Sequence, residues 1–134
     1  MGRWFCGRRP SKYGSVRVAG FDSKAEASRA AVLRLLAIAG EITDLREHVA
    51  LDVHPEGCQP IRYKADFVYR ERGRQVIEDV KGGVLTEVWR LKWKLTRWKY
   101  PNAILRVAYC QGAHWMIKDE EPCQQPSESC SSTT

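Results

Sequence analysis

Alternation of apolar and polar residues predicts a β-hairpin in the middle of the chain. From Tyr63 to Tyr69 every second residue is apolar or aromatic, which is the pattern of a strand with one buried face. A second run of period two extends from Arg74 to Lys81, and Arg72-Gly73 lies between the two runs as a tight turn. The alternation places four residues of the first strand on one face: Tyr63, Ala65, Phe67 and Tyr69.

Three charged residues stand out in this hairpin. Asp66 lies on the opposite face of the first strand, and Asp79 and Lys81 project together from one face of the second strand. Adjacent strands lie about 5 Å apart, so these three side chains are expected to meet near the strand ends. The common explanation for such a set is solvent-facing charge, but Ile77 shares the face of Asp79. Two carboxylates gathered in this way suit Mg²⁺ or Mn²⁺, which bind carboxylates, water and substrate phosphate.

A helix is predicted from Ser23 to Ala39. Glu26 lies in line with Ala30 and Leu33, on an apolar stripe that is expected to face the sheet. A carboxylate on a buried stripe needs a partner, and a metal ion or its bound water is one. The spacing Ser23-x-x-Glu26 also fits a capping box, in which the Glu accepts a hydrogen bond from the backbone of the Ser. The two roles are compatible.

Gly40 occupies the position where a left-handed residue ends a helix, and a strand is predicted to follow from Ile42 to Val53. A β-bulge near Arg46 is expected because the apolar phase shifts there. We interpret His48 and His54 as residues of the surface or of the edge of the core rather than as ligands.

A second helix is predicted from Thr86 to Lys99, with a core stripe of Val88, Leu91, Leu95 and Trp98. Trp89 and Trp93 lie four residues apart on another face, where they could pack in the core, contact a second subunit or stack on unpaired bases. Lys92 borders the core stripe, so its stem could pack along the sheet or its amine could contact a phosphate. The candidate DNA-binding residues of this helix are Lys92, Lys94 and Arg97.

Two further strands are predicted, from Ala103 to Cys110 and from Ala113 to Lys118. The element order is therefore α-β-β-β-α-β with an extra C-terminal strand. The strand-helix-strand step from residue 74 to residue 110 calls for a right-handed parallel crossover. We expect an α/β fold in which helices flank a mixed central sheet.

The 134 residues support one domain, predicted over residues 21–118. Residues 1–20 contain five basic side chains and no acid, so we expect a flexible arm that lies on a phosphate backbone, with Arg8, Arg9 and Lys12 as candidate DNA contacts. Residues 119–134 are polar and rich in Ser and Pro, and are expected to be disordered. Residues 1–118 carry 22 basic and 12 acidic side chains, a surplus that favours a nucleic acid partner.

Hydropathy and cysteine usage point to the cytoplasm. No apolar run approaches the roughly 20 residues of a membrane span, and the N-terminus has no signal-peptide core, so no membrane partner is expected. The five cysteines are widely spaced and form no CxxC pair, which favours reduced thiols over a zinc site or a disulfide framework.

Several segments together resemble a family of small phage and prophage nucleases in the PD-(D/E)XK nuclease superfamily. They are KYG (12–14), FDSKAEA (21–27), ADFVY (65–69), EDVKG (78–82) and LKWKL (91–95) followed by YP (100–101). The resemblance implies a restriction-endonuclease-like αβββαβ core and an active site with Glu26, Asp66, Asp79 and Lys81. It also implies Mg²⁺ (or Mn²⁺) held by Asp66, Asp79, the carbonyl of Val80 and Glu26. Ala65 stands where many members carry proline.

The expected function is hydrolysis of DNA phosphodiester bonds by a metal-dependent endonuclease. Relatives of the resembling family include junction-resolving nucleases and the nuclease subunit of Tn7-like transposases. The preferred expectation is branched or recombination DNA as substrate and a homodimer as assembly. Two alternatives stay open: a nicking nuclease that works with a transposase or a phage replication or packaging partner, and a DNA-binding module without activity. The resemblance places the protein in the cytoplasm of a bacterial host, as a phage or prophage product.

Overall fold

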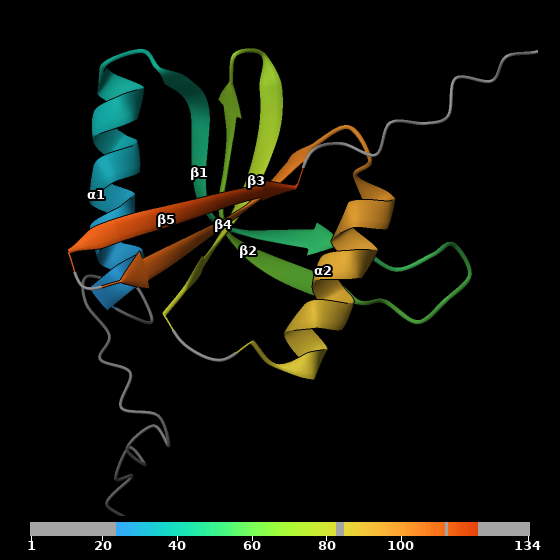
Figure 1. Ribbon diagram of the computed structural model, residues 1–134. Helices are drawn as coiled ribbons and strands as arrows, with labels where there is room; N and C mark the ends of the chain where they lie inside the picture. The colour runs from blue at the N-terminus through green and yellow to red at the C-terminus, as the bar shows by residue number, and fades with distance from the viewer. Residues whose placement is uncertain (1–23, 83–84, 112, 121–134) are drawn as a thin grey trace, which may run out of the picture.

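The computed structural model describes residues 24–82, 85–111 and 113–120, which form one five-stranded sheet with a helix on either side (Figure 1). In chain order the elements are α1 (Lys24–Ile38), β1 (Ile42–Asp52), β2 (Arg62–Glu71), β3 (Arg74–Lys81), α2 (Glu87–Lys99), β4 (Ile104–Gln111) and β5 (His114–Glu120). This αβββαβ order with an extra C-terminal strand confirms the predicted fold class. The predicted arm and most of the predicted tail lie outside the described residues.

The strands follow one another across the sheet in the order β1-β2-β3-β4-β5. The central strand β3 pairs in parallel with β4, and the other neighbouring pairs are antiparallel. A parallel pair needs a crossover, and α2 supplies it. Helix α1 packs against β1 and β3, and α2 contacts β2.

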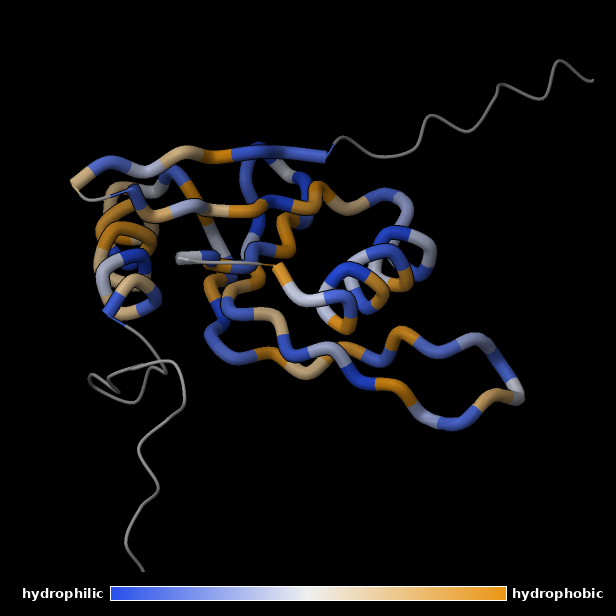
Figure 2. Tube along the Cα trace, turned by 60° about the horizontal axis from the view of Figure 1, so that its bottom comes forward, coloured by the Kyte–Doolittle hydropathy of each residue, from blue (hydrophilic) through white to orange (hydrophobic). Residues whose placement is uncertain are grey.

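The hydrophobic core has two parts, one under each helix. On the α1 side, Ala30 and Leu33 pack with Phe67 and Tyr69, and on the α2 side Trp93 packs with a set that includes Leu51, Val53, Tyr63 and Ala65. Hydrophobic and hydrophilic residues both occur along the strands (Figure 2). Five consecutive residues of β3, Val76 to Val80, are buried, as expected for a strand that is covered on both faces.

The prediction that Tyr63, Ala65, Phe67 and Tyr69 share one face of β2 is wrong. Tyr63 and Ala65 face α2, whereas Phe67 and Tyr69 face α1, so the strand changes face at Asp66. The two longest strands, β1 and β2, run beside α1 for part of their length and then toward α2 (Figure 1). His48 of β1 has a left-handed backbone with φ 53°, which marks a local break of the regular strand next to Asp66.

Turn chemistry explains the remaining irregularities. The register of β1 against β2 shifts between Thr43 and Arg46, which confirms the predicted bulge. Gly40 has φ 79°, the left-handed conformation predicted at the end of α1. Arg72 and Gly73 have φ 52° and 75°, and positive φ at both central residues is typical of the two-residue turn that joins twisted strands.

The predicted core stripe of α2 is wrong for three of its four residues, and only Leu95 packs against the core. Val88, Leu91 and Trp98 are 58–64% exposed, whereas Trp93 and Thr96 are buried. The two indoles decide the orientation: Trp89 stacks on Trp93 at 5.1 Å between ring centroids, and Trp93 meets Tyr63 edge to face at 6.0 Å. Two indoles that stack on each other against the sheet bury more area than Val88 and Leu91 would. Of the three predicted roles of the Trp pair, the structure shows core packing.

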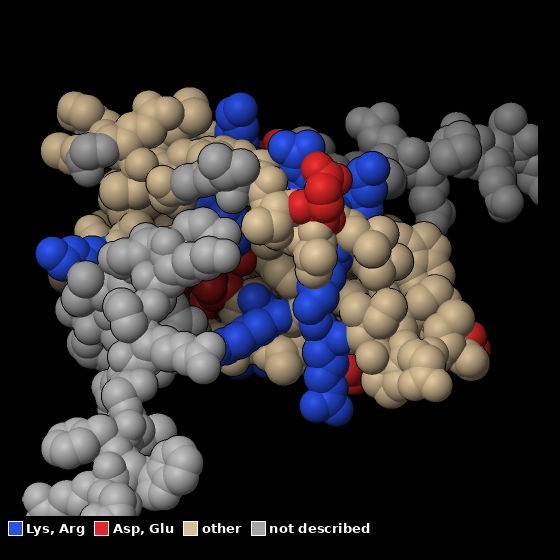
Figure 3. Space-filling view, turned by 90° about the horizontal axis from the view of Figure 1, so that it is seen from below, with Lys and Arg blue, Asp and Glu red and all other residues tan. Residues whose placement is uncertain are grey.

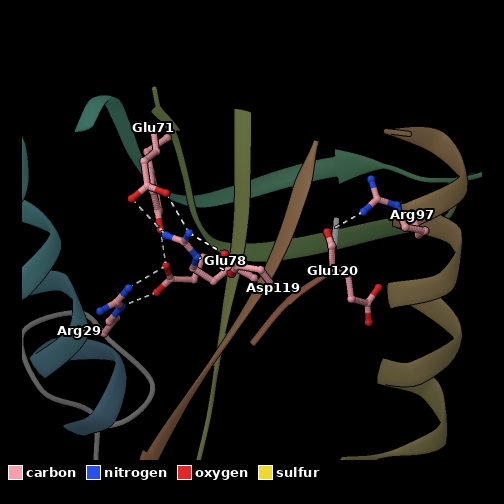
Figure 4. A network of polar contacts seen from close by, with 8 residues as sticks. Arg29, Glu71, Glu78, Arg97, Asp119 and Glu120 are labelled. Atoms are coloured by element: carbon pink, nitrogen blue, oxygen red, sulfur yellow. Dashed lines mark hydrogen bonds and ion pairs between the residues drawn. The ribbon is translucent and has the colours of Figure 1, made fainter. Parts of the chain in front are cut away.

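A buried network of charges ties the sheet to α1 (Figure 4). Glu78 is fully buried, and its carboxylate accepts hydrogen bonds from Arg29 at 2.5 Å and 3.1 Å and from the hydroxyl of Tyr69 at 2.5 Å. Arg106 of β4 extends the network to Tyr69 and Glu71. Glu78 therefore points away from Asp79, as strand parity predicts.

Strand β5 continues farther than predicted. Asp119 and Glu120, placed in the predicted disordered tail, pair with Arg106 and Leu105 of β4. Glu120 also accepts a hydrogen bond of 3.2 Å from the indole of Trp93, and Asp119 accepts one from Arg106 at 2.7 Å. These long-range partners stabilise a strand end that its local composition does not predict.

Candidate active site

The end of β3 brings Asp79 and Lys81 together, as predicted. The amine nitrogen of Lys81 lies 2.6 Å from Oδ2 of Asp79. Residues two apart on a strand point to the same face, so the contact follows from the strand geometry of β3. Asp79 is 3% exposed as a whole residue, whereas 24% of the Lys81 side chain is exposed. The amine therefore links a buried carboxylate to the surface.

Two aromatic residues hold the carboxylate of Asp79. The hydroxyl of Tyr63 donates to Oδ1 at 2.6 Å, and the indole N–H of Trp89 donates to Oδ2 at 2.9 Å. Burial, together with the negative charge of Asp79, raises the pKa of Tyr63 above its usual value, so the phenol stays a donor. The amine of Lys81 lies 5.1 Å from the centroid of the Trp89 ring, so the indole positions both charged groups.

Asp66 joins this pair through the backbone. Its Oδ2 accepts a hydrogen bond of 2.8 Å from the amide of Val80, the residue between Asp79 and Lys81. Pairing between β2 and β3 ends at Phe67 and Glu78, so the two strands diverge beyond that point. The amide of Val80 is therefore free of β2 and available to the side chain of Asp66. The role predicted for the carbonyl of Val80 stays a prediction.

The electrostatic state of Asp66 reflects crowded carboxylates. Burial raises its pKa, the charge of Asp79 raises it further, the hydrogen bond from Val80 lowers it and the charge of Glu26 raises it, to a net value of about 8. Like charges that share a site oppose ionisation of one another. Asp66, Asp79 and Glu26 are thus brought near one another.

Glu26, His48 and Asp66 offer three ligand atoms that all lie within 4.8 Å of one another. Glu26 stands in the first turn of α1, on the same side as the fully buried Ala30 and Leu33. The sequence predicts this stripe correctly. Two carboxylates and an imidazole are a donor set that fits a divalent cation.

His48 is the functional candidate that the sequence did not reveal. Its place follows from strand pairing, because Glu47 pairs with Phe67 and Val49 with Ala65, which sets His48 across from Asp66. The available signal was that the strands predicted at residues 42–53 and 63–69 follow one another along the chain, and consecutive strands commonly pair. Without the register of that pairing, a histidine in β1 cannot be assigned to any particular neighbour.

The surface around the site is hollowed and carries both signs of charge. Seen from below, acidic side chains lie inside a depression and basic side chains stand beside it (Figure 3). A groove of about 1000 Å³ also runs along α2, and its lining residues include Trp89, Arg90, Lys94 and Lys118. Trp89 belongs both to this groove and to the carboxylate cluster, so the two features adjoin.

The predicted DNA-binding residues have different positions. Lys94 is exposed and lines the groove, and Lys92 is half-buried. The guanidinium of Arg97 donates to the carbonyls of Tyr100, Ala103 and Glu120, among others, and its predicted contact with DNA stays a prediction. These bonds fix the end of α2 against β4 and β5, which is a structural role. The predicted contacts Arg8, Arg9 and Lys12 lie outside the described residues.

Comparison with known proteins defines the family. The chain belongs to the family described as Protein of unknown function (DUF1064), which it matches over residues 10–116. No curated protein matches it. The crystal structure of SSO0001 is similar at a TM-score of 0.45 and 14% identity, over 72% of this chain and 52% of that chain. The chain thus spans about half the length of that protein.

Neither helix of the described part of the chain is long and apolar enough to cross a membrane.

Proposed function

We propose that this protein is a metal-dependent endodeoxyribonuclease of the PD-(D/E)XK type. The observation that carries the proposal is the cluster at the end of the β2–β3 hairpin. There Lys81 contacts Asp79, and Asp66 binds the backbone between them. Glu26 and His48 approach Asp66 from α1 and β1. Charges that only face solvent on a hairpin are exposed, whereas Asp79 is buried, so solvent-facing charge does not explain this cluster.

Glu26, Asp66 and Asp79 are the side chains that would hold the divalent metal. When bound, such an ion polarises a phosphoryl oxygen and lowers the pKa of a water molecule. Lys81 is placed to orient that water or to neutralise charge on the phosphoryl group, because its amine is partly exposed beside Asp79. Trp89 and Tyr63 hold Asp79 in one orientation, which keeps the carboxylate in place during the reaction.

The charge distribution supports a DNA substrate. Residues 1–118 carry ten more basic than acidic side chains. In the groove beside the site, the basic lining residues outnumber the acidic ones: Arg90, Lys94, Arg97 and Lys118 against Glu87, Asp119 and Glu120. Contacts of this kind neutralise phosphates and are independent of sequence. We further propose branched or recombination DNA as substrate and a homodimer as the active assembly, because symmetric cutting of a junction requires two sites. A phage or prophage origin and action in the bacterial cytoplasm are part of the same proposal.

The test is cleavage of four labelled DNA substrates: linear duplex, single strand, flap and four-way junction. Each is incubated with Mg²⁺, Mn²⁺ or EDTA and with the wild type, Asp79→Ala or the control Asp52→Ala. Asp52 is also a β-strand carboxylate, but its side chain is 61% exposed and it pairs with Arg62 at the surface. We expect metal-dependent cleavage by the wild type and the control, and DNA binding without cleavage by Asp79→Ala.

Two results separate the alternatives. Paired symmetric cuts in the junction by the protein alone support the branched-DNA proposal, whereas activity only in the presence of a second protein supports a nicking subunit. An Asp79→Ala protein that cleaves at the wild-type rate would refute the site assignment.

A further inference from the structure

We propose that His48 supplies a nitrogen ligand to the cation held by Glu26 and Asp66, so that this site binds Mn²⁺ in preference to Mg²⁺. The inference rests on the proposed metal-dependent function and deepens it by naming the ion. The sequence alone suggested an all-oxygen site that would accept either ion.

The geometry places the imidazole with the carboxylates. The strand register sets His48 across from Asp66, and its left-handed backbone, φ 53°, lies where β2 changes face. Glu26 reaches the same point from the first turn of α1. Three elements distant in the sequence thus direct one ligand atom each to a single spot, with all atoms within 4.8 Å of one another.

The separation of these atoms is close to that of a coordination sphere. Around an octahedral ion with ligands at about 2.1–2.2 Å, neighbouring ligand atoms lie about 3 Å apart and opposite ones about 4.4 Å apart. The observed limit of 4.8 Å exceeds the larger of these separations by a few tenths of an ångström. Rotamer adjustments of Glu26 and His48 are sufficient to close such a gap.

The chemistry of the donor set favours Mn²⁺ over Mg²⁺, the two ions expected for the proposed reaction. Mg²⁺ is a hard ion that prefers oxygen and retains several waters, whereas imidazole suits ions of the first transition series. Mn²⁺ accepts carboxylate, water and imidazole, so it fits a set of Glu26, Asp66 and His48. A phosphate and water complete its coordination in the same way as for Mg²⁺.

The charges of the neighbouring side chains also favour a cation at this position. Lys81 is paired with Asp79, and the carboxylates of Glu26 and Asp66 lie within 4.8 Å of one another. A cation between Glu26 and Asp66 offsets the repulsion of their carboxylates. A competing arrangement is an imidazolium at His48 that pairs with both carboxylates and binds no metal. The experiment must therefore detect the nitrogen–metal bond itself.

Pulsed electron paramagnetic resonance of bound Mn²⁺ detects that bond, since a coordinated imidazole nitrogen gives a hyperfine coupling. The full-length protein is loaded with Mn²⁺ and compared with His48→Ala and with the control His114→Ala. The chain has three histidines, and His114 is an exposed residue at the start of β5. Binding constants for Mn²⁺ and Mg²⁺ are measured on the same samples by calorimetry, and circular dichroism verifies that each variant is folded.

We expect a nitrogen coupling in the wild type and in His114→Ala, and its loss in His48→Ala. The Mn²⁺ affinity of His48→Ala should fall about 10–100-fold, with a change of less than about 3-fold for Mg²⁺. Wild-type Mn²⁺ binding without nitrogen coupling, or coupling that persists in His48→Ala, overturns the inference.

The outcomes also distinguish this inference from the proposed function. If the protein binds Mn²⁺ through nitrogen but cuts none of the DNA substrates, the inferred metal ligand stands and the proposed nuclease function is refuted. If the protein cuts DNA with Mg²⁺ but does not bind Mn²⁺ through His48, the proposed nuclease function stands and the role of His48 as a metal ligand is refuted.

Discussion

The indole N–H of Trp89 donates a 2.9 Å hydrogen bond to Oδ2 of Asp79, the same oxygen that lies 2.6 Å from the amine of Lys81. One residue of α2 thus fixes the position of two charged groups of β3. Partners that orient a carboxylate from behind typically contribute 10–100-fold to metal affinity or activity.

Replacement of Trp89 by Phe tests this positioning role. An aromatic ring is kept, so part of the contact with Trp93 and Lys81 persists, but the hydrogen bond to Asp79 is lost. We expect the turnover rate on the best DNA substrate to fall about 10–100-fold, with KM for DNA nearly unchanged. Trp98→Phe, at an exposed position of the same helix, is the matched control. Equal rates for both variants would leave Trp89 only a packing role.

Lys81→Met should separate catalysis from binding. Met preserves most of the stem that packs beside Trp89 but removes the charge that contacts Asp79. Removal of one group that stabilises transition-state charge commonly reduces the rate about 10²–10³-fold. Single-turnover cleavage and fluorescence anisotropy on the same DNA would measure the two effects, with retained binding expected. Lys94→Met should give the opposite result, weaker binding with a smaller salt dependence and little change in the rate of bound substrate.

Asp66→Asn should stabilise the protein at high pH. The folded-state pKa of Asp66 is about 8, above the unfolded value, so the folded state holds a proton that the unfolded state releases between these values. Stability contributed by that proton is present at low pH and is lost as pH rises toward 8. The Asn side chain is neutral at every pH, so the melting temperature of the Asp66→Asn protein in EDTA should exceed that of the wild type by a few degrees at about pH 9. The difference should vanish near pH 4, and a constant difference would contradict the assignment.

Glu78→Gln should destabilise the fold strongly. Arg29 lies with its side chain 8% exposed against the fully buried Glu78, so the substitution leaves a buried guanidinium without its counter-charge. Breaking such a pair costs roughly 3–5 kcal/mol in free energy of unfolding, measured by urea denaturation. The control Glu47→Gln removes the partner of Arg34 in a largely exposed pair and should cost less than about 1 kcal/mol.

The orientation of α2 can be tested by two tryptophans of the same helix. Trp93 is 5% exposed and Trp98 is 58% exposed. Trp93→Ala should reduce the free energy of unfolding by about 3–5 kcal/mol, because it leaves a cavity under the helix. Trp98→Ala should change it by less than about 1 kcal/mol. If urea denaturation showed a larger loss of free energy of unfolding for Trp98→Ala than for Trp93→Ala, the core stripe predicted from the sequence would be supported instead.

Local rules decided the elements of this fold and half of the site. Period-two alternation, the Arg72-Gly73 turn and the glycine after α1 define the hairpin and the first helix, because these signals depend only on neighbouring residues. Strand parity alone places Asp79 with Lys81 and turns Glu78 away. The stripe of Glu26, Ala30 and Leu33 follows in the same way from the helical period.

Tertiary contacts decided the rest. The core face of α2 depends on how Trp89 and Trp93 pack on Tyr63, and a helix with apolar residues on two sides does not choose between them by its period. The break of β2 at Asp66, and His48 beside it, depend on the register of β1 against β2. Register is a pairing between segments, so the physical reason lies in packing across the sheet and not within either strand.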